Sequence, residues 1–228
     1  MAQVHPNEIN GVPVPYGATV EELRLKLKES GPIAWAAFEA LSHTLGKGAV
    51  QSLNDLPCSL DWRYRRCAVE AISDHVLILV SAGILTHALE DQNVYAVITA
   101  CRAVGHHRIS TAHTQIVNLL AHAESSVREV AVEALAAVWQ PQDFDTVIRL
   151  YLFDCSPEVS KCSAYALNQN ATSATWRPLY NLWQGSSVAC YRLCAVQLVH
   201  RYGGQEKGQL LGCFQSDEDG HVRKAAAS

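Results

Sequence analysis

The sequence repeats a short apolar signature about every 31 or 32 residues along most of its length. The strong copies are YRRCAVEAI from Tyr64, VREVAVEAL from Val127, YRLCAVQLV from Tyr191 and VRKAAAS from Val222. Weaker copies begin at Ile33, Tyr95 and Val159. A period of this length is typical of stacked helical repeats, in which each repeat packs only against its neighbours. The chain is therefore predicted to form one continuous array.

Each copy carries the spacing of an α-helix. Apolar residues recur at the opening position and three, four, seven and eight places later, which puts them on one helical face. The residue four places after the opening one is small in every copy: Ala37, Ala68, Thr99, Ala131, Ser163, Ala195 and Ala226. Helix axes approach to about 8–10 Å only where side chains permit it. The signature segments are thus expected to be helices that lie close to their neighbours.

A second, shorter apolar stretch follows the signature in the later copies. These stretches are IVNLLAHA after His113, FDTVIRLYLF after Asp143, WRPLYNLW after Thr175 and GQLLGCF after Lys207. The turn residues expected between the two helices are Gly105, Pro141, Asn170 with Ser173, and Gly203 with Gly204. The pattern predicts that each signature helix is followed by an antiparallel return helix, giving one helical hairpin per repeat.

The two ends of the chain differ from the repeats. Residues 1–18 are rich in proline and glycine and are expected to form an extended N-terminal arm. A charged helix over 19–30 is expected to cap the first repeat, and 19–228 to form a single solenoid domain. The last repeat is expected to be incomplete, because the chain stops inside a signature copy.

Composition narrows the class of protein. A hydrophobic content of 49% with 18% charged residues is typical of a folded domain. The net charge of −4 differs from the basic charge of most nucleic-acid-binding domains. No signal peptide is evident, and the longest apolar run, 76–84, is shorter than the roughly 20 residues of a membrane helix. With eight cysteines but no C-x-x-C pair, the expected location is cytoplasmic.

The motif V-R-x-x-A-x-x-A-L resembles the HEAT-repeat family, and especially the short bacterial type also found in phycobilisome lyase proteins. The resemblance covers about 31–228 and implies an all-α, right-handed α-solenoid of about six HEAT-type helical hairpins. It also implies a ladder in which the arginine after the opening residue pairs with acids or carbonyls of the adjacent repeat. Those arginines are Arg65, Arg128, Arg192 and Arg223. In such solenoids the second helices are expected to line the concave surface.

Polar residues recur in register on the expected second helices, with aromatic residues beside them. Arginine, tyrosine and tryptophan dominate the hot spots of protein interfaces. The candidate partner-binding residues are His113, Asp145, Arg149, Arg177, Tyr180, Asn181 and Trp183. The alternative interpretation is that the aromatic residues fill the core between repeats and that the polar residues are merely solvated.

No motif predicts a catalytic, metal or cofactor site. The sequence lacks a G-x-S-x-G motif, a P-loop and a Rossmann glycine pattern. The histidines His106 and His107 are expected in a surface turn, since adjacent histidines on a loop rarely bind one ion. The basic stretch Arg63, Arg65 and Arg66, beside Trp62, is expected to be a solvated helix start.

The sequence therefore favours a non-catalytic scaffold or adaptor that binds another protein or peptide on its concave face. The resemblance suggests an alternative, a phycobilin lyase-like or chaperone-like role on a tetrapyrrole-binding partner. A HEAT-like DNA repair glycosylase is less favoured, because of the negative net charge. The oligomeric state is left open.

Overall fold

The computed structural model describes residues 7–29, 32–46, 62–63, 65–66, 69–70, 83 and 85–228. The chain divides into two compact units, Met1–Leu119 and Leu120–Ser228. Both units are built from α-helices, which confirms the all-α repeat fold. The strong signature copies that begin at Val127, Tyr191 and Val222 each lie at the start of a helix in the second unit, as the period predicts.

The N-terminal unit begins with a small β-hairpin. Strands β1 (Glu8–Ile9) and β2 (Val12–Pro13) pair antiparallel, with Ile9 opposite Val12. Asn10 and Gly11 form the turn with φ of 48° and 80°, the left-handed region that two-residue hairpin turns require. The hairpin packs on α2. Where the sequence predicts an extended arm, the chain folds back on itself at this asparagine–glycine pair.

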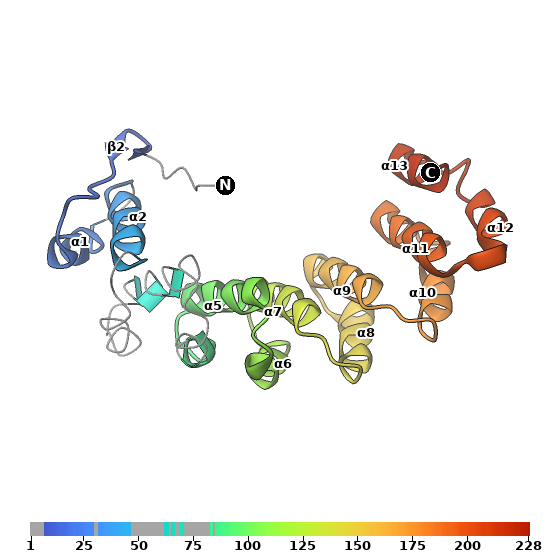
Figure 1. Cartoon of the computed structure of the whole chain (residues 1–228), viewed down its shortest axis with the longest axis horizontal. Coiled ribbons are helices and arrows are strands. Elements are labelled where there is room, and N and C mark those ends of the chain that lie inside the picture. Colours follow the sequence, from blue (N-terminus) through green and yellow to red (C-terminus); the bar gives the residue numbers. More distant parts are fainter. Residues whose placement is uncertain are drawn as a thin grey trace. The chain divides into compact units, whose positions relative to one another are not determined.

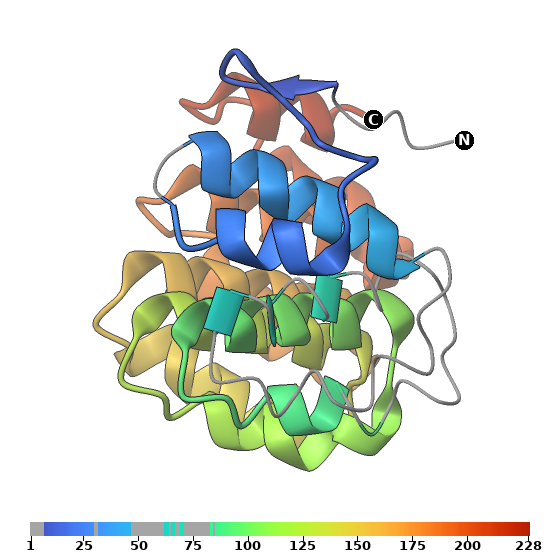
Figure 2. The ribbon, with the colours of Figure 1, turned by 90° about the vertical axis from the view of Figure 1, so that its left-hand side faces the viewer.

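Helices α1 (Val20–Lys26) and α2 (Pro32–Gly46) lie side by side in blue in Figures 1 and 2. Helix α1 starts with a capping box, in which the Thr19 hydroxyl accepts from the Glu22 N–H and the Glu22 carboxylate accepts from the Thr19 N–H. Leu23 and Leu27 are buried. Helix α1 therefore packs its buried leucines against α2, within the range 19–30 where a capping helix is expected.

The rest of the described N-terminal unit contains α5 (Val94–His107), the 3₁₀ turn η2 (Ser110–Ala112) and α6 (His113–Leu119). The turn expected at Gly105 is wrong. Helix α5 continues through this glycine and ends at Arg108, whose φ of 52° is left-handed and whose N–H donates to the carbonyls of Gly105 and Val104. A single glycine is tolerated within a helix. The expected surface turn at His106 and His107 is therefore the last turn of a helix.

The C-terminal unit alternates long and short helices. Its elements are α7 (Ser125–Ala137), α8 (Asp143–Phe153), α9 (Pro157–Gln169), α10 (Trp176–Trp183), α11 (Ala189–Tyr202), η3 (Gly204–Glu206), α12 (Lys207–Gly212) and α13 (Gly220–Ala226). We call α7, α9, α11 and α13 the signature helices, and α8, α10 and α12 the intervening helices. Each intervening helix lies on an apolar stretch predicted to be helical.

The pairing of the helices differs from the expectation at two of the three intervening helices. Helix α8 packs against α9 and α10 packs against α11, so each of these two forms a hairpin with the signature helix that follows it, whereas α12 packs against α11, the signature helix that precedes it. A period alone fixes the distance between equivalent helices but not which neighbour closes the hairpin. The short connection 154–156 between α8 and α9 favours this choice, because short loops join antiparallel neighbours.

The signature helices of the C-terminal unit form a row of their own. Helices α7 and α9, α9 and α11, and α11 and α13 pack directly on one another. In Figure 1 the row curves, with the intervening helices on its outer side. The expectation that second helices line the inner side is therefore wrong for this unit. The small residues explain it, since Ala131, Ser163 and Ala195 are completely buried and let the signature helices approach closely.

In the described part of the chain, none of the helices combines the length and the apolar character needed to span a bilayer.

Candidate functional site

Arginine–aspartate pairs join the repeats. Arg128 donates from Nε and Nη2 to the two carboxylate oxygens of Asp154, both at 2.8 Å. Arg192 makes the same pair of 2.8 Å bonds to Asp217. In the N-terminal unit Arg65 does so with Asp91 at 2.6 and 2.7 Å. Each pair links a signature segment to the loop before the next signature helix, so the ladder implied by the HEAT resemblance is present at these three joints.

Each aspartate also holds the N-cap residue of the next signature helix. The second carboxylate oxygen of Asp154 accepts from the Ser156 N–H at 2.9 Å, and Asp217 accepts from the Asp219 N–H at 2.9 Å. The guanidinium of Arg128 lowers the pKa of Asp154 through its hydrogen bonds, against the opposing effect of burial, and Arg192 lowers the pKa of Asp217 in the same way. The carboxylates of Asp154 and Asp217 are therefore ionised, and their role is to hold successive repeats together.

The pairs occur at alternate joints. Where the arginine is replaced by Ala96 or Ser160, the loop position of the aspartate is taken by His122 or Ser186. These residues keep the capping bond, since the His122 Nδ1 accepts from the Glu124 N–H and the Ser186 hydroxyl accepts from the Val188 N–H. The sequence carries the signal: aspartate stands 25 or 26 residues after Arg65, Arg128 and Arg192 and is missing after the other copies.

The predicted partner-binding residues lie on the intervening helices and in two different units. Asp145 and Arg149 are exposed one turn apart on α8, and Asn181 is exposed on α10. Arg177 pairs with Glu206 and lies over the Trp176 ring, 4.4 Å from its centroid. His113 begins α6 in the N-terminal unit, apart from this set.

Tyr180 and Trp183 are not surface residues, which corrects the expectation for both. Trp183 is completely buried and Tyr180 is 2% exposed. Trp183 meets the Tyr151 ring edge to face at 5.9 Å, and Tyr180 meets Phe214 at 6.4 Å. The core-filling alternative therefore holds for these two aromatic residues, because α10 packs this face against α11.

The exposed end of α8 carries apolar side chains that the sequence interpretation missed. Phe153 is 80% exposed and Leu152 is 48% exposed. Both follow Arg149 by three or four residues, so the three side chains share one side of the helix. Leu182 on α10 is also exposed. The signal available in the sequence is that LYLF continues the apolar run beyond what one helical face can bury.

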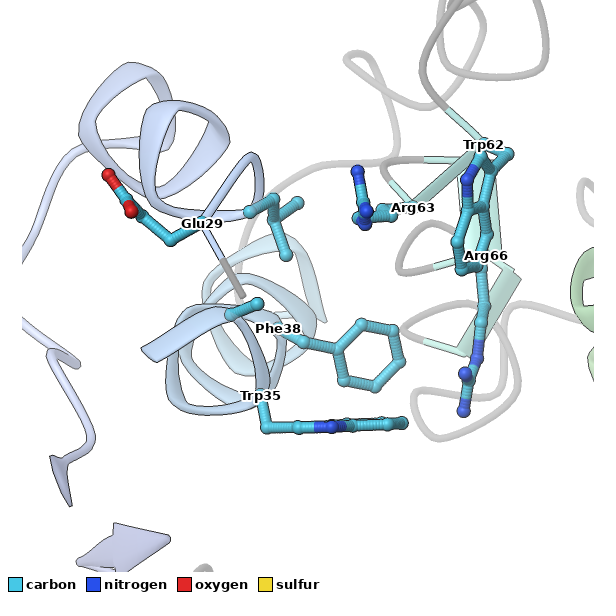
Figure 3. Close-up of a pocket in the computed structure, with 8 residues that line it drawn as sticks. Glu29, Trp35, Phe38, Trp62, Arg63 and Arg66 are labelled. Carbon is cyan, nitrogen blue, oxygen red and sulfur yellow. The ribbon is translucent and has the colours of Figure 1, made fainter. Parts of the chain in front are cut away.

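A pocket of about 270 Å³ lies in the N-terminal unit, between α1, α2 and the residues Trp62, Arg63 and Arg66 (Figure 3). Three aromatic side chains, Trp35, Phe38 and Trp62, form its walls together with Leu27 and Ala34; Arg63, Arg66 and Glu29 complete it. The expectation of a solvated basic helix start is thus wrong for this stretch. The arginines have separate environments, since Arg65 is held by Asp91 while Arg63 and Arg66 line the pocket.

One group of potential metal ligands occurs in the described part of the chain. The Cys162 thiol lies 3.9 Å from a Glu129 carboxylate oxygen and 3.8 Å from one of Glu133. Burial, together with the two glutamates, raises the pKa of Cys162 to about 12. The thiol is therefore protonated at neutral pH and donates a weak hydrogen bond to the carboxylates.

Stacked helical hairpins joined by Arg–Asp pairs define an α-helical repeat protein. No family model and no curated protein sequence matches the chain. Among solved structures it is similar to an engineered protein of the Northeast Structural Genomics Consortium, with a TM-score of 0.60 and 17% identity over 90% of this chain, which spans 65% of that protein.

The chain is also similar to the complex of CpcE and CpcF of phycocyanin lyase from Nostoc sp. PCC7120. The TM-score is 0.54 and the sequence identity is 16%. The match covers 96% of this chain and 98% of the matched chain in that structure. At these identities the likeness is one of fold. It confirms the helical-repeat fold that the sequence predicts.

Proposed function

We propose that the protein is a non-catalytic scaffold or adaptor that binds another protein or peptide through the outer surface of the C-terminal unit. The observation that carries this proposal is Phe153, an aromatic side chain 80% exposed beside Leu152 and one turn from exposed Arg149. Exposed apolar patches rimmed by polar residues mark interaction sites. Asp145 on the same helix and Asn181 on α10 supply such a rim.

Burial limits which predicted residues belong to this surface. Arginine and aromatic residues contribute most of the binding energy at protein interfaces. Arg149 and Phe153 meet that description and are exposed, whereas Tyr180 and Trp183 support the surface from beneath. Arg177 stands at the edge of the surface, because Glu206 and Trp176 already engage it.

The test compares proteins captured from a lysate of the source cell by two variants. Arg149→Ala/Phe153→Ser removes the proposed contact residues, and Lys161→Ala changes an exposed basic residue of the signature helix α9 as the matched control, in place of any residue of the intervening helices. We expect a set of proteins retained by the wild type and by Lys161→Ala, and lost with the double variant at an unchanged melting temperature. Retention of the same proteins by the double variant would remove this surface from consideration.

The second candidate is a phycobilin lyase-like role. It is supported by the similarity to the CpcE and CpcF complex, which extends over almost the whole of both chains. The experiment incubates the protein with a bilin and a phycobiliprotein acceptor subunit and follows visible absorbance. Absorbance that stays on the denatured acceptor only when the protein is present would support this role, and acceptor that remains colourless would reject it.

A further inference from the structure

The pocket of the N-terminal unit combines flat apolar walls with positive charge. Trp35 and Phe38 project from one face of α2, and Trp62 faces them from the segment 62–66 (Figure 3). Trp35 is 49% exposed, so one wall is also open to solvent. Aromatic walls of this kind favour a planar ring, which stacks on them or meets their edges.

Among the lining residues, Arg66 contributes a positive charge that faces the aromatic walls, and Arg63 lies beside it. Arg63 and Arg66 are three residues apart, so their side chains emerge from the same side of a helical turn. In Figure 3 the Glu29 carboxylate points away from the other lining side chains. The electrostatic field inside the pocket therefore favours a negatively charged group.

Arg66 is prepared for such a group. Its guanidinium carbon lies 4.7 Å from the centre of the Phe38 ring and 5.4 Å from that of Trp35, so the charge stands against two aromatic rings. Its Nε is buried and, within the described part of the chain, has no hydrogen-bond partner. A buried donor without a partner costs free energy, which an acceptor recovers once the side chain shifts to let it reach Nε. The planar guanidinium matches a carboxylate, which accepts two parallel hydrogen bonds.

Size restricts the ligand. The volume of about 270 Å³ lies just below the roughly 300–1,000 Å³ of pockets that hold drug-sized molecules. The space suits one aromatic ring with a short acidic arm and is too small for a large polycyclic compound.

We propose that this pocket binds a carboxylate carried on a single aromatic ring. The carboxylate meets Arg66, with Arg63 adding positive charge, and the ring lies among Trp35, Phe38 and Trp62. A free aromatic carboxylate and the C-terminal phenylalanine of a peptide share this chemistry. The site lies in the N-terminal unit, so it is independent of the proposed partner surface in the C-terminal unit.

The experiment titrates the full chain with 3-phenylpropionate and follows tryptophan fluorescence, since two of the five tryptophans line the pocket. The neutral analogue 3-phenylpropionamide is titrated in parallel. We expect saturable binding of the acid, and binding of the amide weaker by about tenfold because the charge-assisted hydrogen bonds are lost. Equal binding of acid and amide would overturn the proposal without any variant.

A second arm separates the two sources of the ligand. A tetrapeptide that ends in phenylalanine is compared with its C-terminal amide. Tighter binding of the free-acid peptide than of 3-phenylpropionate identifies a peptide end as the ligand, and the reverse order identifies a small molecule. Either order supports the site, whereas equal binding of the free-acid and amidated peptides together with failure of 3-phenylpropionate contradicts it.

Two variants assign the site. Arg66→Gln removes the charge, and Arg102→Gln makes the same change at an exposed arginine of α5. We expect Arg66→Gln to weaken 3-phenylpropionate binding by about tenfold or more and Arg102→Gln to leave it unchanged. Should Arg66→Gln unfold the unit, Trp35→Leu tests the same pocket through its exposed wall. Wild-type affinity in a folded Arg66→Gln or Trp35→Leu variant would place the ligand elsewhere.

Discussion

Arg128 of α7 and Asp154, which stands three residues before α9, form a two-bond ion pair that fastens successive signature helices. Both side chains are largely buried, at 11% and 5% exposure. The Nη1 of Arg128 also donates to the His122 and Ala123 carbonyls at 2.9 and 3.0 Å. The guanidinium of Arg128 thus joins the loop before α7 to the loop before α9.

Arg128→Ala should destabilise the C-terminal unit by about 3 kcal/mol, because it leaves the buried Asp154 charge without its partner. Urea unfolding followed by circular dichroism measures the change. Arg149→Ala, an exposed arginine of the same unit, should shift the free energy of unfolding by less than about 0.5 kcal/mol. The double variant Arg128→Ala/Asp154→Ala should lose less than the two single losses added together. Simple additivity would contradict the pairing.

Acid should weaken the fold through the same aspartates. Hydrogen bonds from the arginines hold the pKa values of Asp154 and Asp217 below their ordinary value of 3.8. A carboxyl with a lowered folded-state pKa stabilises the protein above its unfolded pKa and loses that contribution as the pH falls through the folded one. The urea midpoint should therefore drop between about pH 5 and pH 3. Asp154→Asn has no carboxylate to protonate at this position, so its urea midpoint should drop less steeply than that of the wild type. Identical pH profiles for the two proteins would rule out Asp154 as a source of the acid sensitivity.

Trp183→Ala should cost about 3–5 kcal/mol, the range for removing a large buried aromatic side chain. Trp183 is completely buried, while its neighbour Leu182 is 40% exposed. Leu182→Ala is therefore the matched control and should change the free energy of unfolding far less. Equal losses in the two variants would mean that the buried face of α10 has been assigned to the wrong residue.

Arg177→Ala should lower stability by no more than about 1 kcal/mol, since the ion pair with Glu206 is largely exposed. The cation–π contact with Trp176 adds to this small loss. Thermal melts of Arg177→Ala and Glu206→Ala measure it. A larger loss from Arg177→Ala than from Glu206→Ala is expected, because only the arginine contacts the ring; the reverse order would contradict the stacked arrangement.

Thiol reactivity should follow burial. Burial raises the pKa values of Cys101 and Cys194 to about 12, and both side chains are enclosed. Cys155 and Cys213 are exposed. Iodoacetamide near pH 8 should modify Cys155 and Cys213 in the native protein and reach Cys101 and Cys194 only in denaturant. Peptide mass spectrometry reads each site, and equally fast labelling of Cys101 and Cys213 would contradict the packing of α5.

The helices were largely predictable because local signals agree with the period. The Ser156–Pro157 start of α9 combines an N-cap with proline at the first helical position, and both are found there. The hairpin pairing was not predictable, since a repeat distance is the same whichever neighbour a helix joins. The turn predicted at Gly105 was wrong because the identity of a residue does not fix where a helix ends. The helix ends at the residue with left-handed backbone angles, which here is Arg108.

Columns of equivalent positions predict which residues share a helix face but not which way that face points. They led us to expect Asp145, Arg149 and Asn181 at a partner surface, and the structure leaves these three side chains exposed. They could not distinguish these from Tyr180 and Trp183, because the apolar face of a short helix depends on which neighbour it packs against. The pocket depends on contacts between α2 and the segment 62–66, which adjacent arginines in a sequence do not reveal.

The alternation of charged and neutral joints sets a rule for how such a chain can change its length. Losing one hairpin, such as α8 with α9, would remove Asp154 and bring Arg128 opposite Ser186, with no carboxylate to receive it. Losing or duplicating two adjacent repeats would keep every arginine opposite an aspartate. Viable deletions and insertions in this array are therefore expected in pairs of repeats.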